Sequence, residues 1–599
     1  MICRMRCRWI NGLAVRAGRL AALLAAAMLL AGTGAASAQP IRIKVLAFND
    51  FHGQLAAGRS VGGRPVGSAA VLAAYLKAAM AGVETRTFIV NAGDNIGASP
   101  LASALLRDEP TLEFLNRLGN RHCSVDDRLN PDCNLVSTPG NHEFDRGSRE
   151  LLRQLFGGNH ADGPFLRNPW RGVNHAVVSA NVVHADDGRP LLPAFAVKRL
   201  RVADAQGGAR DFRVAFIGAL LRETPGIVPP DGVAGLRFLD EADAVNRAVV
   251  QLKAQGVRAI VLLIHQGGFQ RRYRGFTRPE HAGVSGRIVD IVGRLDPEID
   301  LVVSGHTHAF TNALLPAAGG TRVLVPQAFS AGRAVAAIDL DLDPLSGDVV
   351  ARRARIVTTY ADEGPGLSPD AAIATLVGEA QAAVAPRAQR VIGRYTGTIS
   401  RRATPSGESA MGNLIADAQR ARMGTDIAIV NPGGIRAELR CRKGEVCEAS
   451  YADVFAVQPL GNSLVKLQLT GEQIVRLLEQ QFPPHQRSGS IRFLQVSGLS
   501  WAWDAARVDP ETRACSACVT GARVNGRPLD PKERYTVAVN SFLAAGGDRF
   551  GMLDEGVSLG GGPLDVEVLA DYLAGLPQPF SAPETGARIR RQGPSAGAR

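Results

Sequence analysis

Five short strings of possible metal ligands lie between residues 49 and 308 of the 599-residue chain. They are Asn49-Asp50-Phe51-His52, Gly93-Asp94-Asn95, Gly140-Asn141-His142-Glu143, His265-Gln266-Gly267 and Gly305-His306-Thr307-His308. Two Asp, four His and one Asn among them offer nitrogen and oxygen ligands without a thiolate, a set typical of Zn, Mn, Fe or Co. Seven side chains exceed the needs of one tetrahedral ion, so we expect two ions, each with four contacts if Asp94 bridges them. Two ions about 3.5–4 Å apart are the usual clamp for displacement at phosphorus.

The elements that must position these strings are short strands. Residues 41–48, 87–91, 134–137, 259–264 and 299–303 are apolar, β-branched runs that each end at one string, and 212–217 is a further strand candidate. Helix-like stretches such as 69–80 and 243–254 lie between them, and this alternation favours an α/β layered domain. Because ligands at the carboxyl ends of strands converge on one crevice, we expect one shared metal site.

In this order the strings resemble the signature of the calcineurin-like metallophosphoesterases. The longer string Gly140-Asn141-His142-Glu143-Phe144-Asp145 resembles the 5′-nucleotidase and UDP-sugar hydrolase family in particular. The resemblance implies an N-terminal four-layer α/β/β/α domain. The ligands that it implies are Asp50, His52 and His308 for one metal, Asn141, His265 and His306 for the other, and Asp94 as the bridge.

The same string contains a match to the family's catalytic dyad, His142 and Asp145. An imidazolium near the scissile phosphate stabilises the charge that develops there. A carboxylate three residues further on keeps the imidazolium protonated and oriented. The resemblance therefore implies that these two side chains are catalytic.

The C-terminal half contains features that could select a nucleotide. A glycine pair beside Asn431 and Arg436 allows close backbone approach and charge-assisted contact with a phosphate. Phe542 could stack on a base, and the carboxylate of Asp548 could bind ribose hydroxyls. These strings also resemble the C-terminal substrate-binding domain of the nucleotidase family, which implies that these four residues bind the substrate.

One position departs from the family pattern. The family stacks the base between two aromatic rings, the first of them in a Pro-Phe-Gly string that here reads Pro459-Leu460-Gly461. Stacking on an aromatic platform contributes roughly 1–3 kcal/mol per base, so the leucine should weaken or broaden base preference. Arg401 and Arg402 precede a capped helix expected from residue 408 and are candidates for phosphate binding.

Four functions compete at this point. The leading hypothesis is an exported hydrolase of nucleoside 5′-monophosphates, with UDP-sugars or dinucleotides as further substrates. An alternative is a 2′,3′-cyclic nucleotide 2′-phosphodiesterase with 3′-nucleotidase activity, but that branch usually carries Asn where this chain has Asp145. A thiosulfate-ester hydrolase is a third option. A non-catalytic nucleotide-binding protein is the fourth, although it would be expected to lack metal ligands.

The N-terminus is typical of an export signal. Five arginines accompany an apolar run from Leu20 to about Ala31, and Ala36-Ser37-Ala38 forms a small-residue cleavage site. The run is shorter than the roughly 20 residues of a membrane span, so we expect no stable membrane anchor. Loss of the signal lowers the formal charge from +12 to +7. The remaining basic residues are scattered, which argues against a nucleic-acid partner.

Six cysteines remain after the signal, and they form three pairs that are close in sequence. The pairs are Cys123 with Cys133, Cys441 with Cys447, and Cys515 with Cys518. Three local disulfides in an oxidising compartment would explain this spacing. The last pair could instead be a redox motif or half of a zinc site, but no second CxxC string exists and the stretch is polar and rich in turns.

The expected division of the chain has five parts. They are a signal peptide at 1–38, the metallophosphoesterase domain at 41–360, a linker helix at 361–390, an α+β substrate-binding domain at 391–585 with strands near 427–430 and 535–539, and a loose basic tail at 586–599. We expect a periplasmic or secreted monomer with a small nucleotide as its partner. The linker helix suggests that the domains rotate to bring substrate to the metals, as in the family.

Overall fold

The computed structural model describes residues 39–203, 209–228, 230–272, 274–279, 283–484, 491–515 and 517–593. The predicted signal peptide and the last six residues of the predicted tail lie outside these ranges. Within the described ranges, no helix combines the length and the apolar character that a membrane crossing requires.

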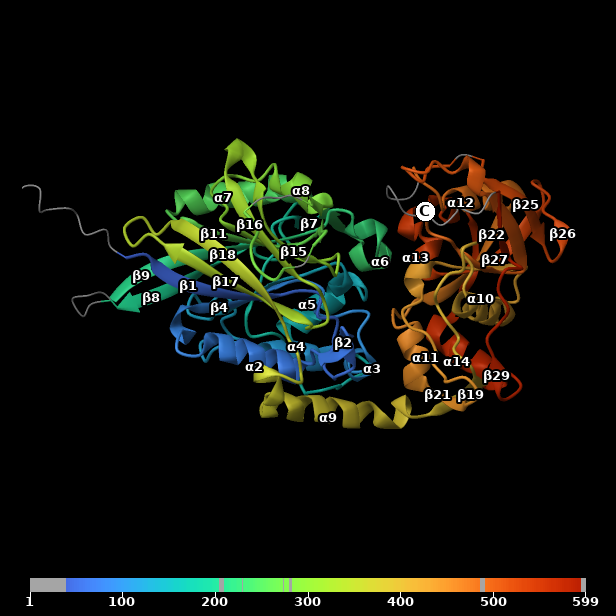
Figure 1. The fold of residues 1–599 in the computed structure, drawn as a ribbon, viewed down its shortest axis with the longest axis horizontal. Coiled ribbons are helices and arrows are strands. Elements are labelled where there is room, and N and C mark those ends of the chain that lie inside the picture. Colours follow the sequence, from blue (N-terminus) through green and yellow to red (C-terminus); the bar gives the residue numbers. More distant parts are fainter. Residues whose placement is uncertain are drawn as a thin grey trace, which may run out of the picture.

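Two six-stranded sheets stack face to face in the N-terminal part of the molecule (Figure 1). The first consists, in spatial order, of β18 (Val349–Thr358), β17 (Ala334–Leu342), β1 (Ile41–Phe48), β4 (Thr87–Ala92), β5 (Leu135–Thr138) and β6 (Ala176–Val177). The second consists of β15 (Phe310–Pro316), β16 (Arg322–Ala328), β14 (Leu301–Ser304), β11 (Ala259–His265), β9 (Ala209–Leu220) and β8 (Phe195–Ala203). Their facing sides share one apolar core, in which the rings of Phe88 and Phe216 meet edge to face at 5.3 Å.

Helices cover the outer side of each sheet. The apolar sides of α2 (Ala69–Met80), α4 (Glu109–Asn116) and α5 (Ser148–Phe156) pack on the first sheet, and those of α7 (Glu241–Ala254) and α8 (Arg287–Val292) pack on the second (Figure 1). Side-chain caps begin α2 and α7, because Ser68 accepts from Val71 N and Asp240 accepts from Asp243 N. The predicted four-layer α/β/β/α order is confirmed.

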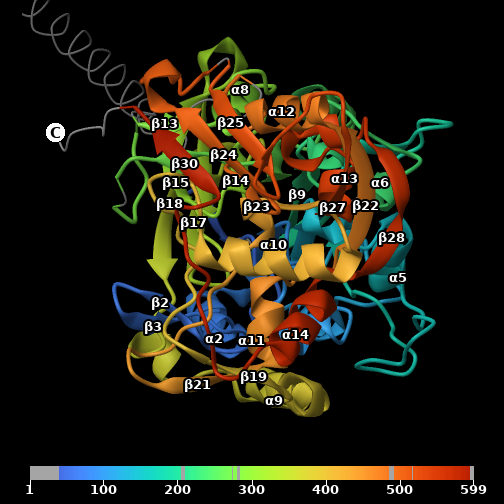
Figure 2. The same ribbon diagram turned by 90° about the vertical axis from the view of Figure 1, so that its right-hand side faces the viewer.

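The C-terminal part is an α+β arrangement, as predicted (Figure 2). Its central sheet contains β23 (Gln495–Ser497), β20 (Ile427–Val430), β27 (Arg534–Asn540), β22 (Ser463–Thr470) and β28 (Val557–Leu564). Two smaller sheets contain β26 (Arg527–Pro528), β25 (Val519–Val524), β24 (Leu499–Asp504) and β30 (Ile589–Gln592), and β21 (Val446–Ser450), β19 (Val391–Thr396) and β29 (Phe580–Ser581). The helices are α10 (Ala410–Met423), α11 (Tyr451–Val457), α12 (Gly471–Glu479), α13 (Ser541–Ala544) and α14 (Asp565–Gly575).

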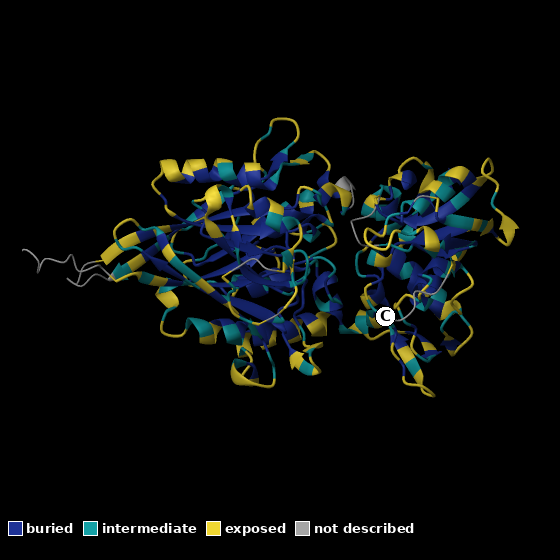
Figure 3. Ribbon diagram, turned by 45° about the horizontal axis from the view of Figure 1, so that its top comes forward, coloured by how far each residue is buried: buried dark blue, intermediate teal, exposed yellow. Residues whose placement is uncertain are grey.

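The helix that was expected as a linker is α9 (Ala371–Ala388), which runs beneath the N-terminal part and ends near the C-terminal part (Figure 1). Its buried face, which includes Ile373, Leu376 and Val384, joins the core formed by α2 and α4. The helix is therefore packed on the helices that cover the first sheet rather than suspended between the two parts. Figure 3 shows the buried strands and the exposed outer sides of the surface helices.

The prediction of a loose tail from residue 586 is wrong for Ile589–Gln592. These residues form β30, which pairs in parallel with β24. Ile589 is fully buried, and the guanidinium of Arg588 makes an ion pair of 2.8 Å with Asp417. The basic composition suggested a solvated tail, but one buried apolar residue and one paired arginine hold the segment in the sheet.

All three predicted local disulfides are present. They join Cys123 to Cys133, Cys441 to Cys447 and Cys515 to Cys518. The sulfur atoms of Cys515 and Cys518 bond to each other, so they are not zinc ligands in this structure. The bridges are consistent with a protein of an oxidising compartment.

Candidate metal centre and nucleotide cleft

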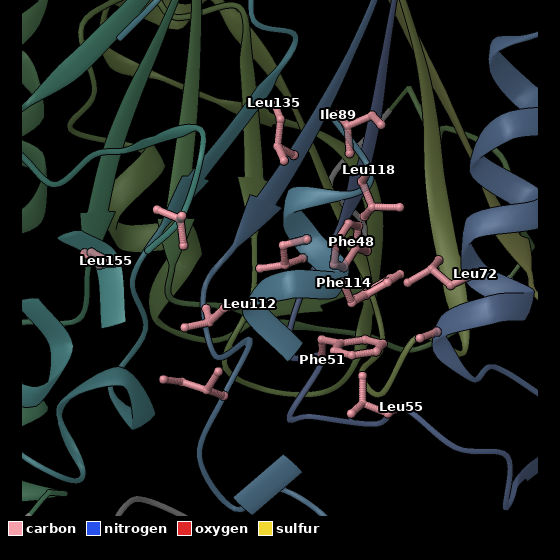
Figure 4. Close-up of a cluster of buried hydrophobic side chains, with 14 of the residues drawn as sticks. Phe48, Phe51, Leu55, Leu72, Ile89, Leu112, Phe114, Leu118, Leu135 and Leu155 are labelled. Atoms are coloured by element: carbon pink, nitrogen blue, oxygen red, sulfur yellow. The ribbon is translucent and has the colours of Figure 1, made fainter. Parts of the chain in front are cut away.

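The first ligand string is held by a buried phenylalanine. Phe51 packs between Phe48 at the end of β1 and Phe114 of α4, with ring centroids 6.3 and 5.0 Å away (Figure 4). Asp50 and His52 flank this anchor, and both have left-handed backbone angles, with φ of 51° and 49°. Such a conformation is costly for residues other than glycine and persists where the surrounding packing enforces it, as it does at many functional sites.

Six of the seven predicted ligands converge in two groups that share Asp94. One group is Asp50, His52, Asp94 and His308, and the other is Asp94, His265 and His306. In the first group, His308 Nε2 lies 2.9 Å from His52 Nε2 and 3.2 Å from Asp50 Oδ1. In the second, His265 Nε2 lies 3.0 Å from Asp94 Oδ2. Each group could hold one ion, and Asp94 is placed to bridge them.

The seventh predicted ligand, Asn141, lies at the same place. Its neighbour His142 donates its backbone N–H to Asp94 Oδ1 at 2.9 Å, so Asn141 lies next to the proposed bridging residue. Asn141 Oδ1 is buried and has no hydrogen-bond partner among the described residues. A buried carbonyl oxygen without a partner is costly, and a metal ion would satisfy it.

Backbone carbonyls fix the orientation of two ligand imidazoles. His52 Nδ1 lies 2.8 Å from Gly97 O, and His265 Nδ1 lies 2.7 Å from Ala92 O. Each contact places the proton on Nδ1 and leaves the lone pair of Nε2 for a metal, the usual arrangement of metal-binding histidines. Hydrogen-bond donors fix the orientation of Asp50, because its carboxylate accepts from Asn49 Nδ2 at 2.6 Å and from His306 N at 3.0 Å.

The electrostatics of the site favour a cation. Burial lowers the pKa of His52 to about 3, so its imidazole is neutral and able to bind a metal. Burial also acts against a charged His265, but Asp94 and Asp50 outweigh it and raise the pKa to about 10. The two carboxylates thus stabilise positive charge at His265, and a divalent ion can take the place of the proton there. The donor set and its charge fit two divalent ions.

Glu143 connects two ligand loops, a role that the sequence analysis did not assign. Its carboxylate accepts backbone N–H groups from Gly140 at 2.6 Å, Asn95 at 2.8 Å and Asp94 at 3.0 Å. Gly140 is required at this contact, because a Cβ there would lie 2.2 Å from Asp94 Oδ1. The Gly-Asn-His-Glu string includes this glutamate, but the sequence pattern alone does not reveal which loop its carboxylate binds.

His142 and Asp145 form a direct pair beside the metal ligands. His142 Nδ1 lies 2.7 Å from Asp145 Oδ2, and the His142 ring lies 5.1 Å from that of His52. Burial acts to lower the pKa of His142, but the carboxylates of Asp145 and Asp94 outweigh it and raise the pKa to about 9. The imidazole is therefore protonated at neutral pH and can stabilise negative charge on a phosphate.

All four predicted substrate residues line one cleft together with this pair. The cleft lies between the N-terminal and C-terminal parts and has a volume of about 220 Å³. Its lining includes Asn141, His142, Asp145 and His306 from the first part and Asn431, Arg436, Leu460, Phe542 and Asp548 from the second. The structure thus brings the metal site and the predicted nucleotide residues together.

Two of these residues are held firmly in place. The half-buried ring of Phe542 rests on Gly547, where a Cβ would lie 2.6 Å from the ring. Asp548 accepts from Asn431 Nδ2 at 2.8 Å and from Arg492 Nη1 at 2.7 Å. An aromatic face and an oriented carboxylate in one cleft are suited to a nucleoside.

Comparisons with known proteins agree with this geometry. Residues 43–310 match the model of the calcineurin-like phosphoesterases, and residues 391–555 match that of the 5′-nucleotidase C-terminal domain. A cell wall protein of Listeria monocytogenes is 31% identical over 572 residues, which cover 90% of this chain and 68% of that protein. The chain belongs to the 5′-nucleotidase family of metallophosphoesterases, which are hydrolases.

A solved structure and a second relative extend the comparison. The 5′-nucleotidase precursor of Thermus thermophilus superposes with a TM-score of 0.68 at 27% identity and covers 93% of this chain and 100% of its own. Endonuclease YhcR of Bacillus subtilis is 30% identical over 557 residues, or 91% of this chain. The present chain spans only 41% of that larger relative.

Two polar residues that line this 5′-nucleotidase-type cleft were not predicted, and two predicted candidates lie elsewhere. Asn462 and Arg492 line the cleft. Asn462 directly follows the Pro459-Leu460-Gly461 string, whereas no sequence pattern pointed to Arg492. Arg401 and Arg402, the candidates for phosphate binding, line a neighbouring groove instead.

Proposed function

We propose that this chain hydrolyses nucleoside 5′-monophosphates to nucleoside and phosphate with two divalent ions, Zn, Mn, Co or Fe. The observation that carries the proposal is the single cleft in which the proposed ligands Asn141 and His306 line the same space as Phe542 and Asp548, the residues suited to a nucleoside. We propose the ligand sets Asp50, His52, His308 and Asn141, His265, His306, with Asp94 as the bridge. When bound, the ions supply Lewis acidity toward the phosphoryl oxygens and lower the pKa of water.

The protein's own side chains then position the ester and stabilise its charge. Phe542 stacks on the base, and Asp548, oriented by Asn431 and Arg492, accepts hydrogen bonds from the ribose hydroxyls. Arg436 and the protonated His142 face the phosphate and stabilise the charge that develops on it. Asp145 keeps the His142 imidazolium charged and holds its Nδ1 side.

The proposal is tested by phosphate release from a defined panel. Purified protein with Mn²⁺ or Zn²⁺ is supplied with AMP, 3′-AMP, 2′,3′-cyclic AMP and UDP-glucose. We expect AMP to have the highest kcat/KM. Cleavage of 3′-AMP and the cyclic substrate without AMP would establish the alternative, a 2′,3′-cyclic nucleotide phosphodiesterase. Tight AMP binding without turnover would instead indicate a nucleotide-binding protein.

We propose that the enzyme acts outside the cytoplasm as a monomer. The N-terminal sequence and the three disulfides support export to the periplasm or the medium. The proposed division into a metallophosphoesterase domain at 41–360, a helix at 361–390 and a substrate-binding domain at 391–585 follows the resemblance. Mass spectrometry of the mature N-terminus would test cleavage after Ala38.

Leu460 provides a test of where the base binds. Leu460 and Phe542 both line the cleft, so Leu460→Phe should restore a second ring against the base. Since stacking contributes roughly 1–3 kcal/mol, we expect KM for AMP to fall about 5-fold or more. Ribose 5-phosphate, which has no base, is the control and should show no change in KM. Equal changes for both substrates would contradict this placement of the base.

A further inference from the structure

Two buried asparagines lie side by side at the nucleotide cleft. Asn431 directly follows β20, Asn540 is the last residue of β27, and these two strands pair in parallel. Each side chain is only 2% exposed. Asn431 lines the cleft, whereas Asn540 is not among the residues described as lining it. Because a buried side-chain amide has both donors and an acceptor to satisfy, the partners of these two amides determine how each is oriented.

Asn540 caps the short helix that carries Phe542. Its Oδ1 accepts from Leu543 N at 2.8 Å at the start of α13. A backbone N–H can only donate, so the amide oxygen of Asn540 must face the helix and its NH₂ group must point away from it. The capping contact thereby fixes the direction in which Asn540 donates.

This orientation is passed on to Asn431. Asn540 Nδ2 donates to Asn431 Oδ1 at 3.1 Å, and Asn431 Nδ2 donates to Asp548 Oδ2 at 2.8 Å. If the Asn431 amide were reversed, its NH₂ would face that of Asn540 and its oxygen would face the carboxylate. Both contacts would be lost, and unpaired buried polar groups are costly. Every donor in the chain from Leu543 N onward therefore points toward Asp548.

The chain ends at the carboxylate that is proposed to bind the ribose. Asp548 Oδ1 accepts from Arg492 Nη1 at 2.7 Å, so a different side chain orients each carboxylate oxygen. Two contacts at two oxygens fix the plane of the carboxylate. A site built to bind a hydroxyl group strongly rejects an analogue that lacks the hydroxyl, provided that its acceptors are held in place. The orientation of Asp548 therefore bears directly on sugar specificity.

We propose that Asn540 is a positioning residue, which fixes the Asn431 amide and through it the Asp548 carboxylate, so that the enzyme prefers a ribose to a sugar without the 2′- and 3′-hydroxyls. The inference rests on the proposed function, because it takes Asp548 to accept from those hydroxyls. Asn540 does not touch the substrate and acts only through its two neighbours. Its oxygen holds the helix of Phe542, and its NH₂ group orients the ribose acceptor.

Steady-state kinetics with two substrates separate these two roles. Asn540→Asp and Asn540→Ser keep a good helix cap, but neither places an N–H donor against Asn431 Oδ1. We expect the ratio of kcat/KM for AMP to kcat/KM for 2′,3′-dideoxy-AMP to fall about 10-fold, because KM for AMP rises as the contacts to a charged group are lost. KM for the dideoxy substrate should not change. An equal loss for both substrates would show a merely structural role and overturn the inference.

Asn159→Asp is the matched control. Asn159 Oδ1 accepts from Trp170 N at 3.2 Å, and its Nδ2 donates to Asn168 Oδ1 at 2.8 Å. These are the same two kinds of contact that Asn540 makes, but the Asn159 side chain is exposed and lies outside the cleft lining. The control should leave the substrate ratio unchanged. Thermal unfolding checks that all three variants fold.

Binding of unreactive nucleosides separates this inference from the proposed function. In calorimetric titrations, the unaltered protein should bind adenosine about 10-fold more tightly than 2′,3′-dideoxyadenosine, and Asn540→Ser should lose this preference. If AMP is hydrolysed but the variant keeps the preference, the inference is wrong and the proposed function stands. Loss of the preference in a protein that does not hydrolyse AMP would support the inference and reject the proposed function. Equal binding of both nucleosides by the unaltered protein would also overturn the inference.

Discussion

Asp94→Asn should lower kcat/KM for AMP about 1,000-fold or more and leave the protein unable to hold two ions. The substitution keeps the shape of the side chain and an oxygen that can accept from His142 N, but it removes the negative charge that both ligand groups share. Metal ions supply several kcal/mol of transition-state stabilisation, and each 1.4 kcal/mol corresponds to about a factor of ten in rate. Turnover of AMP and metal content by mass spectrometry are the two measurements.

The control for this variant is Asp126→Asn, which removes the same charge from a side chain that is 85% exposed. It should bind two ions and hydrolyse AMP at the unaltered rate. An Asp94→Asn variant that is folded, retains two ions per chain and keeps its turnover would show that Asp94 is not the bridge. Loss of turnover with both ions retained would also contradict the bridging role. It would indicate that Asp94 acts instead by orienting His142, whose backbone N–H it accepts.

The metal centre could be predicted because each of its parts is local in sequence. Every ligand lies at the carboxyl end of a strand or within four residues of it. Parallel pairing of β1 with β4 and β5 in one sheet, and of β11 with β14 in the other, brings these ends together. Ligands such as Asp50 and Asp94 can therefore be predicted once the strand that precedes each of them has been recognised. The dyad is equally local, since His142 and Asp145 are three residues apart on one turn.

The features that escaped prediction depend on packing between distant segments. Arg492 and Asp548 are 56 residues apart, and their ion pair exists only because β23 and the turn after α13 meet in the folded C-terminal part. The neighbouring groove that Arg401 and Arg402 line requires Arg59 of the first part to face residues of the second. β30 was mistaken for a tail because its two arginines outweigh its one isoleucine in composition, although the burial of Ile589 holds the strand in place.

His142→Ala should lower kcat for AMP about 100- to 10,000-fold, the usual contribution of a positioned acid or base, while both ions stay bound. Retention of the metals distinguishes this variant from Asp94→Asn. If kcat stays within about threefold of the unaltered enzyme, His142 is not catalytic. A matched control is His184→Ala, which removes a half-buried imidazole on β7 (Val182–His184), outside the residues that line the cleft.

Asp145→Asn tests how the imidazolium is maintained. The active form of His142 is the protonated one, and it is lost as pH rises through a pKa that Asp145 helps to raise to about 9. Removing the carboxylate charge lowers this pKa, so the alkaline limb of the kcat–pH profile should move to lower pH. A profile of Asp145→Asn between pH 6 and 10 that coincides with that of the unaltered enzyme would contradict this role. The shift follows from the sign of the interaction: a carboxylate 2.7 Å from Nδ1 stabilises the charged imidazole and not the neutral one.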